Sequence, residues 1–208
     1  MIINASYENT KHLEELLAVQ AVDGIYLPGD RIEAEEAAGL AERCHQQGKK
    51  AYYAFPYIFR LEALNYFRLH GSTIRDAGFD GYLIRSIDEA GYVREEDFTG
   101  EMVFDAGMYS WNLRAKGILR DMGADILTAP YELNEKELAA RGWDHTEFVV
   151  YGRMPVMISA GCTRKNTQKC TKETGGYEFT PLRDRKLMTF LAENCCRYCY
   201  NVMYNSVP

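Results

Sequence analysis

The chain has 208 residues, of which 47% are hydrophobic and 26% are charged. This is the composition of a soluble globular protein, and the length suits one domain with, at most, a small appendage. A formal net charge of −6 argues against strong nonspecific binding of nucleic acid by the body of the chain. No basic segment followed by an apolar run opens the sequence, and no apolar run approaches the roughly 18 residues of a membrane span. We therefore expect a cytoplasmic protein with no membrane association.

Short apolar runs alternate with amphipathic stretches over residues 1–160. Eight runs have strand character, at residues 2–4, 24–27, 51–55, 81–84, 102–104, 125–128, 148–151 and 156–158. Helices are predicted between them, around residues 12–17, 31–47, 61–77, 111–122 and 135–140. Ser110 and Asn134 precede two of these helices, and both residue types are favoured at helix N-caps.

The predicted strands are mostly continuous apolar runs, which is typical of parallel strands buried on both faces. Strands that alternate with helices favour βαβ units with right-handed crossovers. We therefore predict an α/β fold with a compact (β/α)8 TIM-barrel-like domain at residues 1–160 and a small C-terminal cysteine-rich appendage at residues 161–208. A doubly wound open sheet is the alternative. Neither glycine-rich nucleotide-binding motif follows any of the strands.

Five of the six cysteines lie in the last quarter of the chain, at Cys162, Cys170, Cys195, Cys196 and Cys199. Such a cluster forms a disulfide framework, a metal or iron–sulfur site, or a redox centre. Thiols stay reduced in the cytoplasm, which favours a metal site. Four thiolates suit either a [4Fe–4S] cluster or structural zinc. For Cys44, and for whichever of the five clustered cysteines binds no metal, a buried and chemically idle role is the simpler interpretation.

In a barrel the reactive groups gather at the carboxyl ends of the strands. The catalytic candidates there are Asp105, Glu132 and Arg153, and the substrate-binding candidates are Arg85, Tyr57 and Tyr109. Carboxylates can act as a base or hold a hydroxyl, whereas arginine can hold a carboxylate or phosphate. A buried ion pair of Asp105 or Glu132 with Arg153 is the structural alternative.

The usual peptidase motifs are missing from the sequence. It contains no H-E-x-x-H and no G-x-S-x-G, and its four histidines (His12, His45, His70 and His145) fall in predicted helices or loops away from the strand ends. A hydrolytic site needs a nucleophile with a base, or a metal with an activated water. The residues therefore do not by themselves indicate proteolysis.

Several blocks in the second half of the chain resemble the collagenase-like peptidase family, family U32. These blocks are residues 132–134 (E-L-N), 151–157 (Y-G-R-M-P-V-M), Cys162 and Cys170, residues 182–185 (L-R-D-R), and residues 199–208. The resemblance is best over residues 80–208. It implies either a peptidase or one of the family's oxygen-independent hydroxylation proteins, which act on ribosomal RNA, transfer RNA or quinone precursors and hold a [4Fe–4S] cluster on four cysteines.

The resemblance also suggests roles for individual residues. Cys162, Cys170 and Cys199 match three cluster ligands, and Cys196 is the fourth, with Cys195 as the alternative. Asn112 is similar to an asparagine of the family and is added to the substrate-binding candidates. The spacer between the second and third cysteines is longer here than in the hydroxylation proteins.

The leading hypothesis is an iron–sulfur protein for oxygen-independent hydroxylation, or a related modification, of an RNA base or a small aromatic metabolite. The alternatives are a collagenase-like peptidase acting on a peptide, and a non-catalytic, zinc-stapled module of a larger protein.

Overall fold

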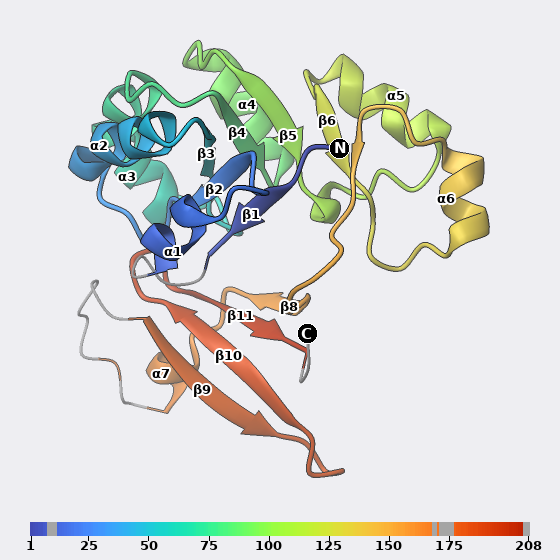
Figure 1. The fold of residues 1–208 in the computed structure, drawn as a ribbon. Helices are drawn as coiled ribbons and strands as arrows, with labels where there is room; N and C mark the ends of the chain where they lie inside the picture. Colours follow the sequence, from blue (N-terminus) through green and yellow to red (C-terminus); the bar gives the residue numbers. More distant parts are fainter. Residues whose placement is uncertain (8–11, 168–169, 171–176, 206–208) are drawn as a thin grey trace. The chain divides into compact units, whose positions relative to one another are not determined.

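The computed structural model of the chain describes residues 1–7, 12–167, 170 and 177–205. Within them the backbone forms two compact units (Figure 1). The first unit contains residues 1–59 and 65–149, and the second contains residues 60–64 and 150–208. No described helix has the length and hydrophobicity needed to cross a membrane.

The first unit is built from parallel strands alternating with helices. Its strands are β1 (Asn4–Ser6), β2 (Gly24–Pro28), β3 (Lys50–Ala54), β4 (Gly81–Ile84), β5 (Glu101–Phe104), β6 (Ile126–Thr128) and β7 (Thr146–Glu147). Its helices are α1 (Leu13–Ala18), α2 (Ala34–Gln46), α3 (Leu61–Arg75), α4 (Ile87–Glu95), η2 (Ala106–Met108), α5 (Leu113–Asp121) and α6 (Glu135–Arg141). Each strand pairs in parallel with the next one along the chain, so the sheet order is β1 to β7 without a reversal.

This strand order gives a TIM-barrel-like half-barrel of seven strands, which is not closed. The prediction of a parallel, barrel-like α/β fold is therefore confirmed, but the predicted closed eight-stranded barrel is wrong. A doubly wound sheet is also excluded, because that topology requires the strand order to reverse.

The predicted eighth strand belongs to the second unit, as β8 (Pro155–Ser159), where it pairs antiparallel with β11 (Tyr200–Tyr204). A parallel neighbour of β7 would need a crossover of a dozen or more residues, and only residues 148–154 separate the two strands. The predicted strand at residues 148–151 is also wrong. Its side chains are exposed, with Val150 92% and Tyr151 84% accessible, and β7 comes immediately before it.

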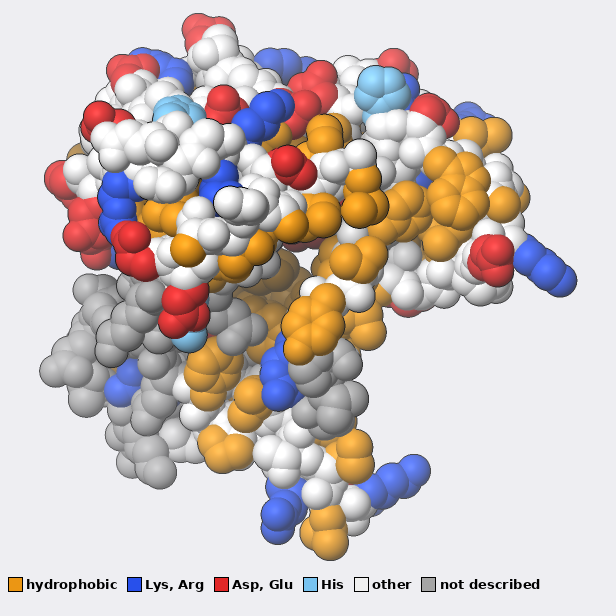
Figure 2. Space-filling model, in the orientation of Figure 1, with side chains coloured by type: hydrophobic (Ala, Val, Ile, Leu, Met, Phe, Trp, Pro, Cys, Tyr) orange, Lys and Arg blue, Asp and Glu red, His pale blue; other side chains and the backbone are white. Residues whose placement is uncertain are grey.

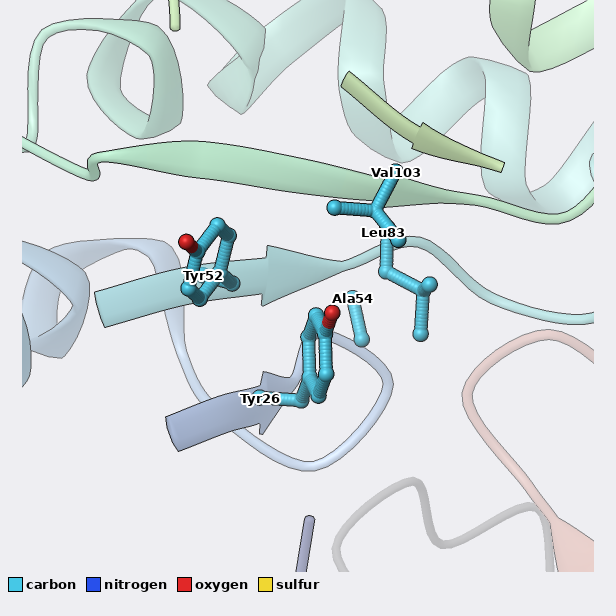
Figure 3. Close-up of a cluster of buried hydrophobic side chains, with 5 residues drawn as sticks. All are labelled: Tyr26, Tyr52, Ala54, Leu83 and Val103. Carbon is cyan, nitrogen blue, oxygen red and sulfur yellow. The ribbon is translucent and has the colours of Figure 1, made fainter. Parts of the chain in front are cut away.

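The inner layer of the half-barrel is apolar in the middle of the strands. Figure 3 shows Tyr26, Tyr52, Ala54, Leu83 and Val103 gathered there, each buried, with Ile126 packed against them. Tyr26 and Tyr52 are in ring contact, with centroids 5.1 Å apart. Burial of these side chains stabilises the sheet mainly through the hydrophobic effect.

Two asparagines begin the helices that follow β5 and β6. Asn134 caps α6 with a complete capping box, because its side chain accepts backbone N–H groups while Glu137 accepts the N–H of Asn134. Asn112, and not the predicted Ser110, caps α5 by accepting the N–H of Ala115 at 2.9 Å. Ser110 is buried, and its hydroxyl instead donates to the Thr128 carbonyl.

The second unit is a four-stranded antiparallel sheet in the order β8-β11-β10-β9, with one short helix. Its further elements are α7 (Thr163–Asn166), β9 (Tyr177–Arg183) and β10 (Thr189–Cys195). Residues 196–199 form the turn between β10 and β11. At the other end of the β9–β10 pair, Arg183, Arg185 and Lys186 are exposed, and Figure 2 shows Lys and Arg side chains at that tip.

Candidate functional site

An ion pair lies at the carboxyl ends of β4 and β5. Arg85 follows β4, Asp105 follows β5, and Arg85 Nε donates to Asp105 Oδ2 at 3.0 Å. Their side chains are only 14% and 13% exposed. Arg85 also donates to the Phe55 carbonyl at 2.6 Å, and the second Asp105 oxygen accepts the N–H of Ala106. These contacts fix both charged groups in one orientation.

Two tyrosines flank this pair. The guanidinium carbon of Arg85 lies 3.9 Å from the ring centroid of Tyr57, which is a cation–π contact. Burial raises the pKa of the Tyr131 hydroxyl, and the negative charge of Asp105 raises it further. Tyr131 therefore stays protonated beside Asp105. Glu132 is adjacent and exposed, and its charge also acts on Tyr131.

Four of the seven predicted barrel residues therefore lie in one neighbourhood: Tyr57, Arg85, Asp105 and Glu132. The sequence offered an ion pair of Asp105 or Glu132 with Arg153, whereas the described partner of Asp105 is Arg85. Arg153 belongs to the second unit, where it donates to the Asn205 carbonyl at 3.2 Å. Tyr109 is 56% exposed, with a left-handed φ of 54°, and ends η2, while Asn112 is occupied as the α5 cap.

Glu147, which sequence reasoning missed, is the acid at the end of β7. Its carboxylate accepts hydrogen bonds from the Tyr26 hydroxyl at 2.9 Å, the Asn4 amide at 3.3 Å and the Thr128 hydroxyl at 3.4 Å. The residue was missed because the apolar run at residues 148–151 was interpreted as the strand. Ending the strand at Glu147, where β7 ends, would have put this residue at a carboxyl end.

The cysteines of the second unit lie around the β10–β11 turn. Cys196 and Cys199 stand at the two ends of this turn, and Cys199 has a left-handed φ of 54°. Cys162 is the N-cap residue of α7, whose Thr163 donates to Asn194 of β10 at 2.7 Å. Asn201 of β11 donates to the Gly161 carbonyl at 3.2 Å. These bonds hold the Cys162 segment against the strands that carry the turn.

Other contacts distinguish the five thiols. The Arg164 guanidinium donates to Cys196 Sγ at 3.4 Å. Burial raises the pKa of the Cys199 thiol, and the charge of Glu62 and then the nearby thiols of Cys162 and Cys170 raise it further. Cys195 is only 2% exposed, at the end of β10. Cys44, in α2, is fully buried, and burial raises its pKa to about 11.

This donor set fits a thiolate-bound group by chemistry, because Cys162 and Cys170 are near enough to act electrostatically on Cys199, and Cys196 shares the turn with Cys199. Soft thiolates are the ligands of iron–sulfur clusters and of structural zinc. Among the described residues, however, no three or more Cys, His, Asp or Glu side chains are already arranged to hold an ion.

The described histidines do not contribute to either neighbourhood. His12 lies beside Glu15, His45 beside Asp80, and His70 beside Glu35, each as an ordinary acid–imidazole contact. His145 is exposed in the turn before β7. Within the described part of the chain we find no histidine hydrogen-bonded to a serine or cysteine, which is the arrangement an activated nucleophile needs.

The half-barrel with polar groups at its carboxyl ends places the protein among the (β/α)-barrel-like proteins. The sequence model of peptidase family U32 matches residues 27–175. The chain therefore belongs to peptidase family U32.

Among solved structures, the U32 peptidase Mk0906 is similar to this chain, with a TM-score of 0.55 and 15% identity over 71% of this chain and 68% of that one. This likeness supports the fold. A glycerol uptake operon antiterminator-related protein from Thermotoga maritima also matches, with a TM-score of 0.41 and 13% identity over 71% of this chain and 92% of that one. Deoxyribose phosphate aldolase from Aeropyrum pernix matches with a TM-score of 0.43 and 12% identity, over 62% of each chain. A comparison with curated protein sequences finds no match.

Proposed function

We propose that this chain is an iron–sulfur protein that performs an oxygen-independent hydroxylation, or a related modification, of an RNA base or an aromatic metabolite. The proposal rests on the gathering of Cys162, Cys170, Cys196 and Cys199 within one small unit of a U32 protein. Cys196 is favoured over Cys195 as the fourth ligand, because Cys195 is buried while Cys196 lies at the turn.

The four thiolates would hold a [4Fe–4S] cluster, which supplies one-electron transfer when bound. Arg164 already donates to Cys196 Sγ, and such hydrogen bonds and positive charges compensate the negative charge of a thiolate site. The barrel residues would bind the substrate. A planar ring can stack against the Tyr57–Arg85 pair, and Asp105 can accept a proton or a hydrogen bond from it.

Anaerobic purification tests the cluster directly. A brown protein with broad visible absorption and about four iron and four sulfide per chain is expected. A colourless protein with one zinc per chain, prepared under the same conditions, would refute the cluster and favour the zinc-stapled module.

Single cysteine substitutions then test the ligand set. Cys162→Ser, Cys170→Ser, Cys196→Ser and Cys199→Ser should each lower the iron content strongly, whereas Cys195→Ser should retain it. Cys44→Ser is the matched control, because Cys44 lies in α2 of the other unit. Loss of iron in Cys195→Ser with retention in Cys196→Ser would exchange the roles of these two residues.

Peptidase activity is the second candidate, and the family assignment is the observation that favours it. It is tested by incubating the purified chain with gelatin and a peptide library. Cleavage that is lost in Asp105→Asn would support a peptidase. Cleavage that survives Asp105→Asn, Glu132→Gln and all the cysteine substitutions would come from a contaminant.

A further inference from the structure

A row of polar side chains crosses the carboxyl ends of β4 to β7. The sheet register aligns Ile84 with Phe104 and Phe104 with Leu127, so the residues that follow, Arg85, Asp105 and Thr128, are level with one another. Asp105 continues the ladder by donating its N–H to the Ile84 carbonyl at 2.8 Å. Glu147 is the register partner of Thr128. Arg85, Asp105, Thr128 and Glu147 therefore form one row.

This row faces the inside of the half-barrel. Leu83 and Val103 lie two residues earlier on the same strands and belong to the inner apolar layer of Figure 3. Ile126, two residues before Thr128, packs against that layer. Residues two apart on a strand point to the same face of the sheet. The polar row is therefore the next layer of the interior, at the end where barrel proteins bind their substrates.

The two acids of the row have different environments. The carboxylate of Asp105 has a cation beside it, because Arg85 Nε lies 3.0 Å from Asp105 Oδ2. Glu147 has hydroxyl and amide donors around it, and the described residues give it no ion-pair partner. Glu147 is only partly exposed, and a carboxyl group withdrawn from water without a cation is costly in its charged form.

The titratable groups that face Glu147 are Tyr26 of β2 and Asp105 after β5, and Tyr52 of β3 is in contact with Tyr26. Burial raises the pKa of Glu147 and the charge of Asp105 raises it further, while the hydrogen bonds from Tyr26, Asn4 and Thr128 oppose the rise. One carboxyl group with a cation beside it and a second without one, in the same site, is a pattern that general acid–base catalysis uses.

We propose that Glu147 is a further catalytic residue of the barrel site, where it acts as the proton-donating acid while Asp105, paired with Arg85, acts as the base. This inference rests on the proposed function, because it assumes that the barrel binds the substrate. Asp105 takes one proton from the substrate and Glu147 gives one to a substrate oxygen or nitrogen. The net change is one proton moved from Glu147 to Asp105, and exchange with solvent restores the starting state.

The first test needs neither substrate nor cluster. The carboxyl groups of protein labelled with ¹³C in Glu and Asp are titrated by NMR, with Glu147→Gln used to assign the Glu147 signal. Asp105→Asn should lower the pKa of Glu147, because it removes a negative charge from the same row. A Glu147 that titrates as an ordinary glutamate and does not respond to Asp105→Asn would overturn the proposal.

Glu101→Gln is the matched control for this titration. Glu101 accepts a hydrogen bond from Tyr52 at 2.6 Å, much as Glu147 accepts one from Tyr26, but it lies at the start of β5 and outside the row. The pKa of Glu147 should be the same in Glu101→Gln as in the unsubstituted protein. A shift as large as that in Asp105→Asn would show only a general effect of charge and would overturn the specific pairing.

The second test is turnover of the substrate by iron-loaded protein. Glu147→Gln should lose about 100-fold or more in rate, the usual contribution of a general acid, at unchanged iron content. Glu101→Gln should stay within a few-fold of the unsubstituted protein. Full activity in Glu147→Gln would overturn the catalytic role. Absence of iron or of turnover in the unsubstituted protein would instead refute the proposed function. The NMR titration would still show whether the pKa of Glu147 depends on the charge of Asp105.

Glu147→Gln is expected to fold. The Gln side chain has the same shape and can still accept from Tyr26 and Thr128. Its amide can donate to the Asn4 amide oxygen, which is buried and has no hydrogen-bond partner among the described residues. Circular dichroism and thermal unfolding check this before either test is interpreted.

Discussion

Arg85 is the residue that joins the parts of the candidate barrel site. It pairs with Asp105, stacks on Tyr57 and donates to the carbonyl of Phe55, the residue that follows β3. Because both charged side chains are largely buried, removing one leaves the other without compensation in a medium of low polarity. The pair is therefore worth testing as a unit.

Arg85→Met should destabilise the folded protein by about 3–5 kcal/mol, the usual cost of breaking a buried pair from one side. Urea denaturation followed by circular dichroism measures this loss. The double variant Arg85→Met with Asp105→Leu should regain part of it, because no charge is then left unpaired. As a control, Glu15→Gln breaks the exposed His12–Glu15 contact and should change stability by about 0.5 kcal/mol or less. An equally small effect in Arg85→Met would contradict the importance of the ion pair.

Glu89, in the first turn of α4, is a second buried acid near Arg85. Its side chain is fully buried and accepts the N–H of Arg85 at 2.6 Å, while the Ser86 hydroxyl accepts the N–H of Glu89. Burial raises the pKa of Glu89 from 4.5 to about 8. In the folded protein this carboxyl therefore keeps its proton through the neutral range, whereas in the unfolded chain it loses the proton near its ordinary pKa.

This shift makes stability depend on pH. Because the pKa is raised on folding, its contribution is complete below the unfolded value of 4.5 and is lost as the pH rises through about 8. Glu89→Gln removes the titration but keeps an acceptor for Arg85. From about pH 5 to about pH 8.5 the unsubstituted protein should lose unfolding free energy relative to Glu89→Gln, by up to about 1.4 kcal/mol per pH unit. Parallel stability curves for the two proteins would contradict the raised pKa.

At the scale of elements, the first residues of α5 and α6 show how far the local sequence predicts a helix N-cap. Both helices are capped by asparagine, although only Asn134 was predicted as a cap. Ser110 lost that role because it is buried beside Arg141, whose guanidinium donates to both its carbonyl and its hydroxyl. Arg141 itself is 1% exposed. A tertiary contact therefore moved the cap to Asn112.

The cap also provides a test of Asn112 as a substrate-binding residue. Asn112→Ala and Asn134→Ala should each cost about 1 kcal/mol of stability through loss of a cap. Asn112→Ser restores an N-cap side chain and should recover most of that stability. If Asn112 also binds substrate, Asn112→Ser will still weaken binding, measured as a raised KM. If the KM is unchanged in Asn112→Ser, the role of Asn112 is to cap α5 and not to bind substrate.

At the scale of the whole molecule, the chain divides into a barrel-like unit and a cysteine-bearing unit. The parallel sheet has a buried cluster of aromatic and aliphatic side chains, whereas the described part of the second unit has fewer buried apolar residues, among them Ala192, Tyr198, Tyr200 and Val202. A small core supplies little net stability, so a bound metal group is expected to contribute much of the folding free energy of the second unit.

Removal of the cluster should therefore affect the two units unequally. Anaerobic chelation of the iron should bleach the visible absorption and make residues 150–205 sensitive to trypsin, while fragments from residues 1–149 persist. Mass spectrometry of the digest measures this difference. As a control, iron-loaded Cys44→Ser protein is digested without chelation. It should show the protection from trypsin that the loaded state gives. Equal protection with and without iron would show that the second unit is stable without a metal group.

Local patterns determined much of this protein. Alternating apolar runs and helices were sufficient for the parallel α/β fold, because each βαβ unit forms largely from neighbouring segments. The same patterns located Arg85 and Asp105 at strand ends, and the blocks around the cysteines were sufficient for the family. The pairing of Arg85 with Asp105, by contrast, follows from the register of β4 and β5, which single residues do not encode.

The sequence by itself therefore determined the fold class, the family and the types of residue available for chemistry. Only the tertiary structure decided that β8 pairs with β11 instead of closing the barrel, because the pattern of residues 148–158 is compatible with a strand in either sheet. Only the tertiary structure brought Glu147 of β7 to Asn4 of β1 and Tyr26 of β2, side chains that are far apart in sequence. Such contacts depend on the stagger and curvature of the whole sheet, and these are collective properties of many strands.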